Sequence, residues 1–410
     1  MGGHPDLREE FPSATDPRHN NNVPERYSTR TNQWTLLTEH TTGYDRIRDE
    51  YQRLHMLPDG TVYFSTVVKD ANRVYEPYAG QFLSSPVIAP PSESVYHHGS
   101  RGTSVLLPLL PGEDYRPRVL VAGAPKARVI DLGEKEPFWR ATARRDWSGE
   151  PPYRYHCTGT LLPTGEVLIS GGTETDGDDA TRQAGVVLPG ELYDPGIDWV
   201  ADTYDKSGAW TTTPPASVGR HYHATALLMP DGLVWTAGSN GPSPYTKDEE
   251  TRVEIYWPPY AGRPNRPTID AVSWRIVYGR TFDIVTQQAR RIRRVALLRN
   301  GSATHGFDFD QRYVGVSFEL VGDDRLRCWA PPWPGVAPAG HYMLWIVDDQ
   351  QRPCARAPFV HLSAASVRTT AAACGKTGTL SLRDDLFPMS GKPSGSVGRM
   401  IFRLQRKCLT

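Results

Sequence analysis

The feature that most constrains the fold of this chain is a hairpin motif that recurs along it. An apolar strand leads into a turn of the Pro-Asp-Gly type, and a second, alternating strand follows. Because Pro and Gly set the backbone angles of tight turns and the flanking residues alternate with a period of two, each copy is typical of a β-hairpin. The copies lie at residues 54–64, 104–109 (degraded), 159–172 and 219–239.

The spacing of these copies predicts a propeller. Their turn prolines, Pro58, Pro108, Pro163 and Pro230, are 50, 55 and 67 residues apart, which brackets the period of about 50 residues of kelch repeats with loop insertions. We therefore expect an all-β fold with an incomplete kelch-like β-propeller of about four blades, preceded by a remnant at residues 25–35. The later strands of the four units are expected at residues 73–77, 128–132, 191–195 and 253–257.

A Pro-rich junction at residues 258–264 indicates a domain boundary. Short alternating strands follow and predict an immunoglobulin-like β-sandwich. The basic run Arg290–Arg294 is expected at a solvated edge of this sandwich. The expected strands lie at residues 295–299, 313–320, 325–329, 341–347 and 358–362. The expected domains are a disordered N-terminus at 1–24, the propeller at 25–260, the sandwich at 264–362 and a low-complexity tail at 363–410.

The charge balance favours a small-molecule partner. With 46 Lys and Arg against 46 Asp and Glu, the net charge favours neither nucleic acid nor an anionic membrane. No apolar run approaches the roughly 18 residues needed to cross a bilayer, and residues 1–22 lack the apolar core of a secretion signal. The sequence thus predicts a soluble monomer that binds a small ligand, and it leaves the localisation open.

The five cysteines are widely spaced and form no Cys-x-x-Cys pair. Cys328 and Cys354 lie in one β-rich region, where they could form a buried disulfide or remain as two buried thiols. Their number and spacing neither prove nor exclude an oxidising compartment.

Three residues suggest a metal site. Tyr222 and His223 adjoin a Pro-Asp-Gly turn within a strand pattern, and His305 lies in a loop of the second domain. Imidazole and phenolate together suit copper(II), which accepts tetragonal nitrogen and oxygen coordination. A histidine in a turn is more often solvated or hydrogen-bonded, so spacing alone leaves both interpretations open.

Two other polar clusters have simpler interpretations. His97 and His98 are expected in a loop before a blade, because adjacent strand residues point to opposite faces and would not share one ion. The run Asp176–Asp179 could hold calcium, but it lacks EF-hand spacing and is expected in an exposed loop.

At these positions the sequence resembles the copper radical oxidases, such as galactose oxidase and glyoxal oxidase. The resemblance covers about residues 25–362. In that family a propeller is followed by an early-set, immunoglobulin-like domain. Four motifs in the right order carry the resemblance: Arg-x-Tyr-His-x-Thr-Ala-Leu-Leu-x-Pro-Asp-Gly at 220–232, Glu-Ile-Tyr-x-Pro-Pro-Tyr at 254–260, Ala-Thr-His-x-x-Asp-x-Asp-Gln-Arg at 303–312 and Ala-Gly-His-Tyr-Met-Leu at 339–344.

The resemblance implies an oxidase that converts primary alcohols or aldehydes and reduces dioxygen to hydrogen peroxide at a single copper ion. His223 and His305 would be equatorial copper ligands. Tyr222 would be the axial ligand and the general base that accepts the substrate hydroxyl proton.

One departure from the family pattern is large. The family's radical cofactor is a second tyrosine cross-linked to a cysteine, in blades that precede the part matched here, and the family's propeller has seven blades. We therefore expect an N-terminally truncated propeller without the Cys-Tyr radical cofactor. Cys157 and His156 are possible substitutes in the third unit, although a buried thiol and a packing residue are the more common roles.

Two further hypotheses remain. The chain could be a non-catalytic copper- or carbohydrate-binding propeller, because propellers bind ligands through their loops regardless of redox chemistry. It could also be an unstable product, because an open arc of blades exposes sheet edges.

Overall fold

The computed structural model describes residues 25–37, 53–65, 73–83, 102–174, 185–204, 208–239 and 250–364. The predicted disordered N-terminus, the tail beyond Ala364, and the loops that contain His97, His98 and Asp176–Asp179 lie outside these ranges. Within them the secondary structure consists of strands and short 3-10 turns, as the recurring hairpins predict. None of the helices in these ranges could span a membrane.

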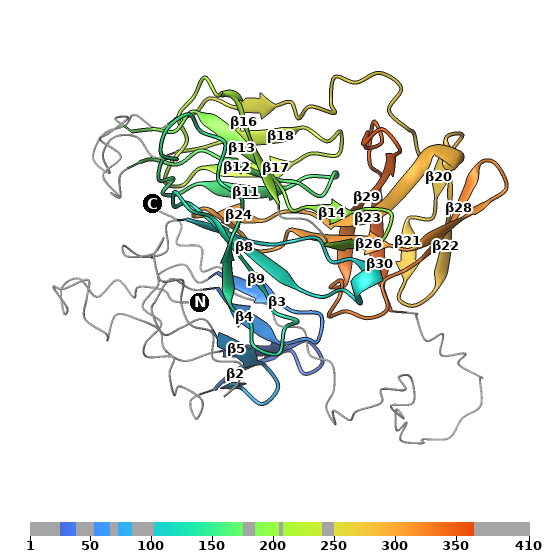
Figure 1. Ribbon diagram of the computed structural model, residues 1–410. Helices are drawn as coiled ribbons and strands as arrows, with labels where there is room; N and C mark the ends of the chain where they lie inside the picture. The colour runs from blue at the N-terminus through green and yellow to red at the C-terminus, as the bar shows by residue number, and fades with distance from the viewer. Residues whose placement is uncertain are drawn as a thin grey trace.

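The predicted β-propeller is present as a series of antiparallel sheets (Figure 1). The first blade contains β3 (Leu54–Met56), β4 (Val62–Phe64), β5 (Arg73–Glu76) and β6 (Gln81–Phe82). The second contains β7 (Thr103–Leu106), β8 (Arg118–Ala122), β9 (Arg128–Asp131) and β10 (Trp139–Ala141). The third contains β11 (Thr158–Leu161), β12 (Val167–Ser170), β13 (Pro189–Asp194) and β16 (Ala209–Pro215), with a small hairpin of β14 (Ile197–Asp198) and β15 (Thr203–Tyr204) inserted before β16.

The fourth unit has a smaller sheet than the three blades before it. Its sheet has three strands among the described residues: β17 (Thr225–Leu228), β18 (Val234–Ala237) and β19 (Glu254–Tyr256). The remnant is a separate hairpin of β1 (Glu25–Ser28) and β2 (Gln33–Leu36).

The recurring turns close the first two strands of three blades in the same way. Gly60, Gly165 and Gly232 have φ of 89°, 89° and 85°, a left-handed conformation that glycine adopts without steric cost. In the first and fourth blades the turn aspartate accepts a hydrogen bond from the backbone N–H two residues on: Asp59 from Thr61 at 2.9 Å and Asp231 from Leu233 at 3.0 Å. The recurring turn thus marks where these three blades begin.

The second domain is the predicted sandwich of two sheets. One sheet has the order β21 (Arg275–Val277), β30 (Phe359–Ser363), β29 (Gly340–Asp348), β23 (Ile292–Arg299), β26 (Arg312–Val316). The other has the order β20 (Ala271–Val272), β22 (Thr281–Val285), β28 (Arg325–Trp329), β27 (Phe318–Val321). The single strand predicted at 313–320 is wrong, because the chain leaves one sheet at Ser317 and enters the other.

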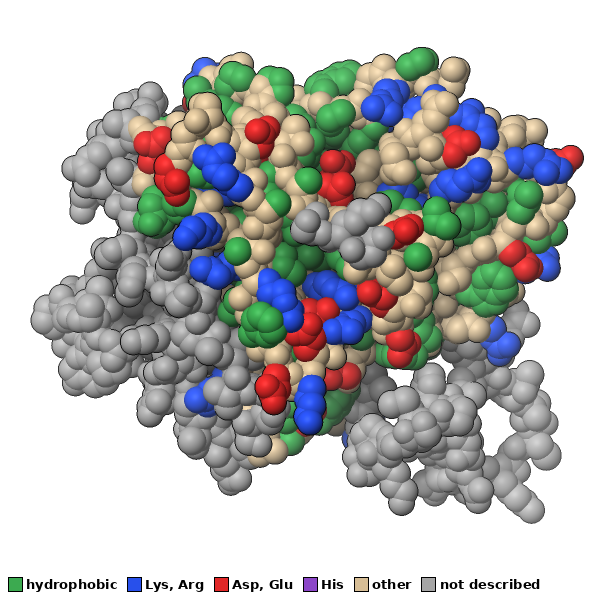
Figure 2. All heavy atoms as spheres, in the orientation of Figure 1, with side chains coloured by type: hydrophobic (Ala, Val, Ile, Leu, Met, Phe, Trp, Pro, Cys, Tyr) green, Lys and Arg blue, Asp and Glu red, His purple; other side chains and the backbone are tan. Residues whose placement is uncertain are grey.

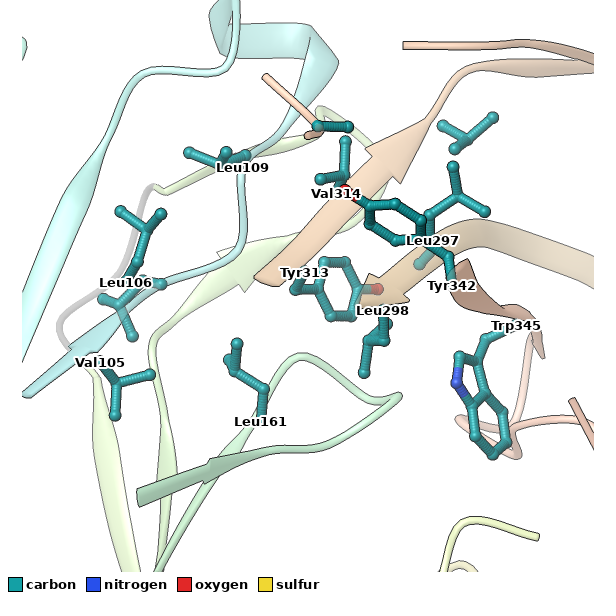
Figure 3. Packing of buried hydrophobic residues seen from close by; sticks show 14 of the residues in the cluster. Val105, Leu106, Leu109, Leu161, Leu297, Leu298, Tyr313, Val314, Tyr342 and Trp345 are labelled. Carbon is teal, nitrogen blue, oxygen red and sulfur yellow. The ribbon is translucent and has the colours of Figure 1, made fainter. Parts of the chain in front are cut away.

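The two domains share one apolar core (Figure 3). Val105, Leu109 and Leu161 of the propeller pack with Leu297 and Tyr313 of the sandwich in a single buried cluster. The backbone of Leu109 pairs with the sandwich through Leu109 N to Tyr313 O at 3.0 Å and Gly315 N to Leu109 O at 2.8 Å. Such continuity holds the sandwich in a fixed position on the propeller.

The basic run is not the solvated edge that we expected. β23 lies inside its sheet, between β29 and β26, and Arg294 is buried. Its guanidinium donates to Thr164 O of the third blade at 2.6 Å and lies 4.1 Å from the Trp199 ring centroid. Arg294 therefore joins the two domains, while Arg290 and Arg293 remain exposed.

Charged side chains of both signs lie side by side on the face shown in Figure 2, in keeping with the balanced net charge. Cys157, Cys328 and Cys354 are free, buried thiols, so Cys328 and Cys354 form no disulfide.

Candidate metal centre

Tyr222 and His223 lie at the entrance to the first strand of the fourth blade. We expected them within a strand, but β17 begins only at Thr225. His223 has φ of 65°, and Ala224 N donates to His221 O at 2.9 Å, closing a turn. A left-handed conformation costs roughly 1–2 kcal/mol for a residue with a Cβ, so the surrounding structure holds His223 in a conformation that a free chain would avoid.

His305 lies at the tip of a hairpin that extends from the sandwich. The hairpin consists of β24 (Ala303–Thr304) and β25 (Phe307–Asp308), and His305 and Gly306 have φ of 54° and 73°. β25 packs against β7 and β11, and β24 packs against β17. The hairpin thus lies among the first strands of three successive blades.

Side chains of the same loop dock it to the propeller. Gln311 donates to Gly159 O at 2.7 Å and accepts from Leu161 N at 2.9 Å, both in the third blade. Arg312 is buried and donates to Met56 O of the first blade at 2.8 Å. The loop is therefore held against both the first and the third blade.

Two buried side chains shape the tip itself. Asp308 accepts the backbone N–H groups of Ser302, Asp310 and Gln311 at 2.8, 3.0 and 2.9 Å, which folds the loop around its carboxylate. Arg53 of the first blade donates to His305 O at 3.1 Å and to Gly102 O at 2.7 Å. Sequence reasoning missed Arg53, since its role depends on a contact across 252 residues.

The three predicted residues meet. Nε2 of His223 lies 2.7 Å from Nε2 of His305, and the two rings are nearly perpendicular at 83°. The ring of Tyr222 stacks on that of His223, with centroids 3.9 Å apart, and lies 5.4 Å from that of His305. His223 is exposed, and the other two are half-buried.

This donor set fits a metal ion. With metal–nitrogen bonds of about 2.0 Å, two imidazole nitrogens at right angles around one ion lie about 2.8 Å apart, close to the observed 2.7 Å. Two imidazoles and a phenol are the donors that copper accepts. No group of three or more His, Cys, Asp or Glu side chains that could hold a metal ion occurs in the described ranges, so a site here would take its third donor from Tyr222.

His305 is prepared to act as a ligand. Its Nδ1 lies 2.7 Å from the hydroxyl of Thr304, and this contact orients the ring with Nε2 toward His223. Burial, followed by the charges of His223 and Arg53, lowers the pKa of His305 to about 3. The imidazole is therefore neutral at physiological pH, the form in which histidine binds metal ions.

Cys157 and His156, the two possible substitutes in the third unit, have different surroundings. Cys157 is fully buried with its Sγ 4.0 Å from Ala122 O, and burial raises the pKa of its thiol, as expected for an inert packing thiol. The ring of His156, in contrast, lies 5.0 Å from that of Tyr222.

Comparisons with known proteins identify the family of the chain. A model of the family described as "Glyoxal oxidase N-terminus" matches residues 18–260, more than half of the chain. The chain belongs to the glyoxal oxidase family. A second model, "Galactose oxidase-like, Early set domain", matches residues 266–362.

Two relatives of this glyoxal oxidase family member are named as oxidases. It is 29% identical to "Aldehyde oxidase GLOX" of Vitis pseudoreticulata over 73% of this chain and 60% of that protein. It is 30% identical to "Galactose oxidase" of Gibberella zeae over 48% of this chain and 28% of that protein. The chain thus spans less than two thirds of the length of these relatives.

A solved structure shares the fold. It is a fungal alcohol oxidase of the AA5 family in complex with copper, with a TM-score of 0.64 and 22% identity over 83% of this chain and 70% of that one. The likeness supports the combination of a propeller and a sandwich.

Proposed function

We propose that this protein is an oxidase that converts primary alcohols or aldehydes and reduces dioxygen to hydrogen peroxide at a copper ion held by Tyr222, His223 and His305. The observation that carries the proposal is the 2.7 Å separation of the His223 and His305 Nε2 atoms. These atoms come from two domains, and the sandwich hairpin reaches the propeller where they meet. Membership of the glyoxal oxidase family supports the same reading.

The three residues would have different roles. His223 and His305 would hold the ion through their Nε2 atoms, and Tyr222 would accept the hydroxyl proton of the substrate as general base. When bound, copper would supply a Lewis acid and a one-electron redox centre. Each turnover removes two electrons and two protons from the alcohol, or from the hydrate that an aldehyde forms with water, and transfers them to dioxygen. The products are one aldehyde or one carboxylic acid, respectively, and one hydrogen peroxide.

A one-electron metal leaves half of this oxidation to another group. In the family that group is a tyrosine joined to a cysteine, and the sequence leaves it unassigned. The alternative function, a copper- or carbohydrate-binding propeller without turnover, follows if no such group acts with this chain.

The test is a peroxide-coupled assay on copper-loaded protein with primary alcohols and aldehydes, beside metal analysis. We expect one copper per chain and peroxide formation, both lost in His223→Ala and His305→Ala. His341→Ala serves as the control, because His341 is an exposed histidine of the sandwich. Histidine-dependent copper without peroxide would support the alternative, and absence of copper binding would contradict both.

A further inference from the structure

His156 in the third blade is the positional counterpart of His223 in the fourth. Each histidine lies seven residues before the turn proline of its blade, Pro163 or Pro230, and two residues before its first strand. The backbone conformations also agree, with φ of 64° at His156 and 65° at His223. Both are left-handed, which is uncommon for a residue with a Cβ and requires support from the fold.

The side chain of His156 is directed toward the candidate metal centre. Its ring centroid lies 5.0 Å from that of Tyr222 in an edge-to-face arrangement at 68°, and only 6% of the residue is exposed. Tyr222 is thus held between two imidazoles, stacked on His223 and in edge contact with His156. Edge-to-face aromatic pairs have a preferred geometry, so this contact restricts the plane of the phenol.

The backbone at His156 and Cys157 contacts the loop that contains His305. A Cβ placed on Gly306, beside His305, would lie 2.7 Å from Cys157 O and 3.5 Å from His156 C. The sandwich hairpin therefore rests directly on the His156–Cys157 backbone. One short segment of the third blade contacts both Tyr222 and the His305 loop.

This segment is rigidly anchored. Arg154 is buried and donates to Glu191 at 2.7 Å, to Pro189 O at 2.8 Å and to Gly171 O at 3.0 Å. Tyr155 N and Thr173 O pair at 2.9 Å, and Thr173 N returns a bond to Tyr155 O at 3.0 Å. Because several hydrogen bonds hold this segment, the segment can keep the groups that it contacts in defined positions.

We propose that His156 is a positioning residue for Tyr222, holding the phenol in the orientation required for a ligand and base beside His223 and His305. His156 forms no group of three potential ligands with the two histidines in the described ranges, so the proposal assigns it to Tyr222 and not to the metal. The proposal rests on the proposed function only for the role of Tyr222.

The first experiment needs no metal. A double-mutant cycle between His156→Ala and Tyr222→Ala in the full, metal-free chain measures the contact itself. We expect coupling of about two- to tenfold in the unfolding equilibrium constant. His55→Ala is the matched control: His55 is also 6% exposed and makes an edge-to-face contact at 5.3 Å, but with Phe307, so its cycle with Tyr222 should show no coupling. Absence of coupling for His156 would overturn the proposal, even if copper binds.

The second experiment separates positioning from mere stability. In copper-loaded protein the tyrosine-to-copper charge-transfer band, assigned by its loss in Tyr222→Phe, should shift or weaken several-fold in His156→Ala while the copper content is retained. His156→Phe, which keeps an aromatic edge, should restore the band. A band unchanged in His156→Ala would overturn the proposal. If the wild-type chain binds no copper, the proposed function fails, and the metal-free cycle alone decides for or against His156.

Discussion

Gln311 of the sandwich and Gly159 of the third blade are joined by a hydrogen bond of 2.7 Å between side-chain Nε2 and backbone O. The same amide accepts Leu161 N at 2.9 Å. Gly159 and Leu161 are buried, so truncating Gln311 would leave a buried donor and a buried acceptor without partners. We expect Gln311→Ala to reduce the free energy of unfolding by about 2–6 kcal/mol, since each of the two unpaired buried groups costs about 1–3 kcal/mol.

The loss should also reach the metal centre, because Gln311 belongs to the loop that carries His305. Copper affinity, measured by competition with a chelator, should fall in Gln311→Ala. Gln287→Ala, at an exposed glutamine of the sandwich, should change neither quantity. Equal copper affinity in wild type and Gln311→Ala would contradict this role of the loop.

Glu191 forms the centre of a buried charge cluster in the third blade. Its carboxylate accepts from Arg145 at 2.6 Å and from Arg154 at 2.7 Å. Removing one partner of such a cluster leaves uncompensated buried charge, so we expect Glu191→Gln to cost about 3–5 kcal/mol in urea unfolding. Glu134→Gln, which breaks a bond to the exposed Arg140 at 2.9 Å, should cost less than about 1 kcal/mol.

The pKa of the same carboxylate makes the stability of the fold depend on pH in the acid range. Burial acts to raise the pKa of Glu191, but the hydrogen bond from Arg145 and the charges of Arg154 and Arg145 outweigh it and lower the pKa. A lowered carboxylate pKa stabilises the fold above the unfolded value of about 4.3 and loses this contribution as pH falls through the folded value. The stability difference between wild type and Glu191→Gln should therefore shrink below about pH 4.

The sequence predicted most of this arrangement where local chemistry decides. The recurring turns located the first, third and fourth blades, and the sequence placed His305 in a loop of the second domain, although without the two short strands that flank it. Prediction failed where the deciding contact is distant in sequence. Arg294 is indistinguishable in sequence from exposed neighbours, yet Thr164 and Trp199 of the other domain bury it. The position of His156 against Tyr222 likewise follows from the packing of adjacent blades.

His55 predicts a second pH effect of the same sign. Burial, followed by the charges of Arg312 and Arg53, lowers the pKa of His55 to about 3. The unfolded chain therefore binds a proton below about pH 6.5 that the folded chain does not. Stability should fall as pH decreases from 6.5 toward 3, with His55 contributing up to about 1.4 kcal/mol per pH unit. His55→Gln, which can keep the bond to Ser104, should flatten this slope in denaturation series of the metal-free chain.

Gly306 offers the sharpest test of how closely the two domains approach at the metal centre. Its φ of 73° strains any other residue, and a Cβ would lie 2.7 Å from Cys157 O, a backbone atom that cannot turn aside. Gly322 has nearly the same φ, 70°, with nothing within 4 Å of its Cβ position. Gly322→Ala should therefore show only the conformational cost, roughly 1–2 kcal/mol, and normal copper affinity. Gly306→Ala should lose more stability than this in thermal unfolding, and it should also weaken copper binding, because the hairpin must move away from the third blade and take His305 with it. Equal stability losses and equal copper affinities in Gly306→Ala and Gly322→Ala would contradict this prediction. They would show that the hairpin can accommodate a Cβ at Gly306 and that the His223–His305 distance does not depend on this contact.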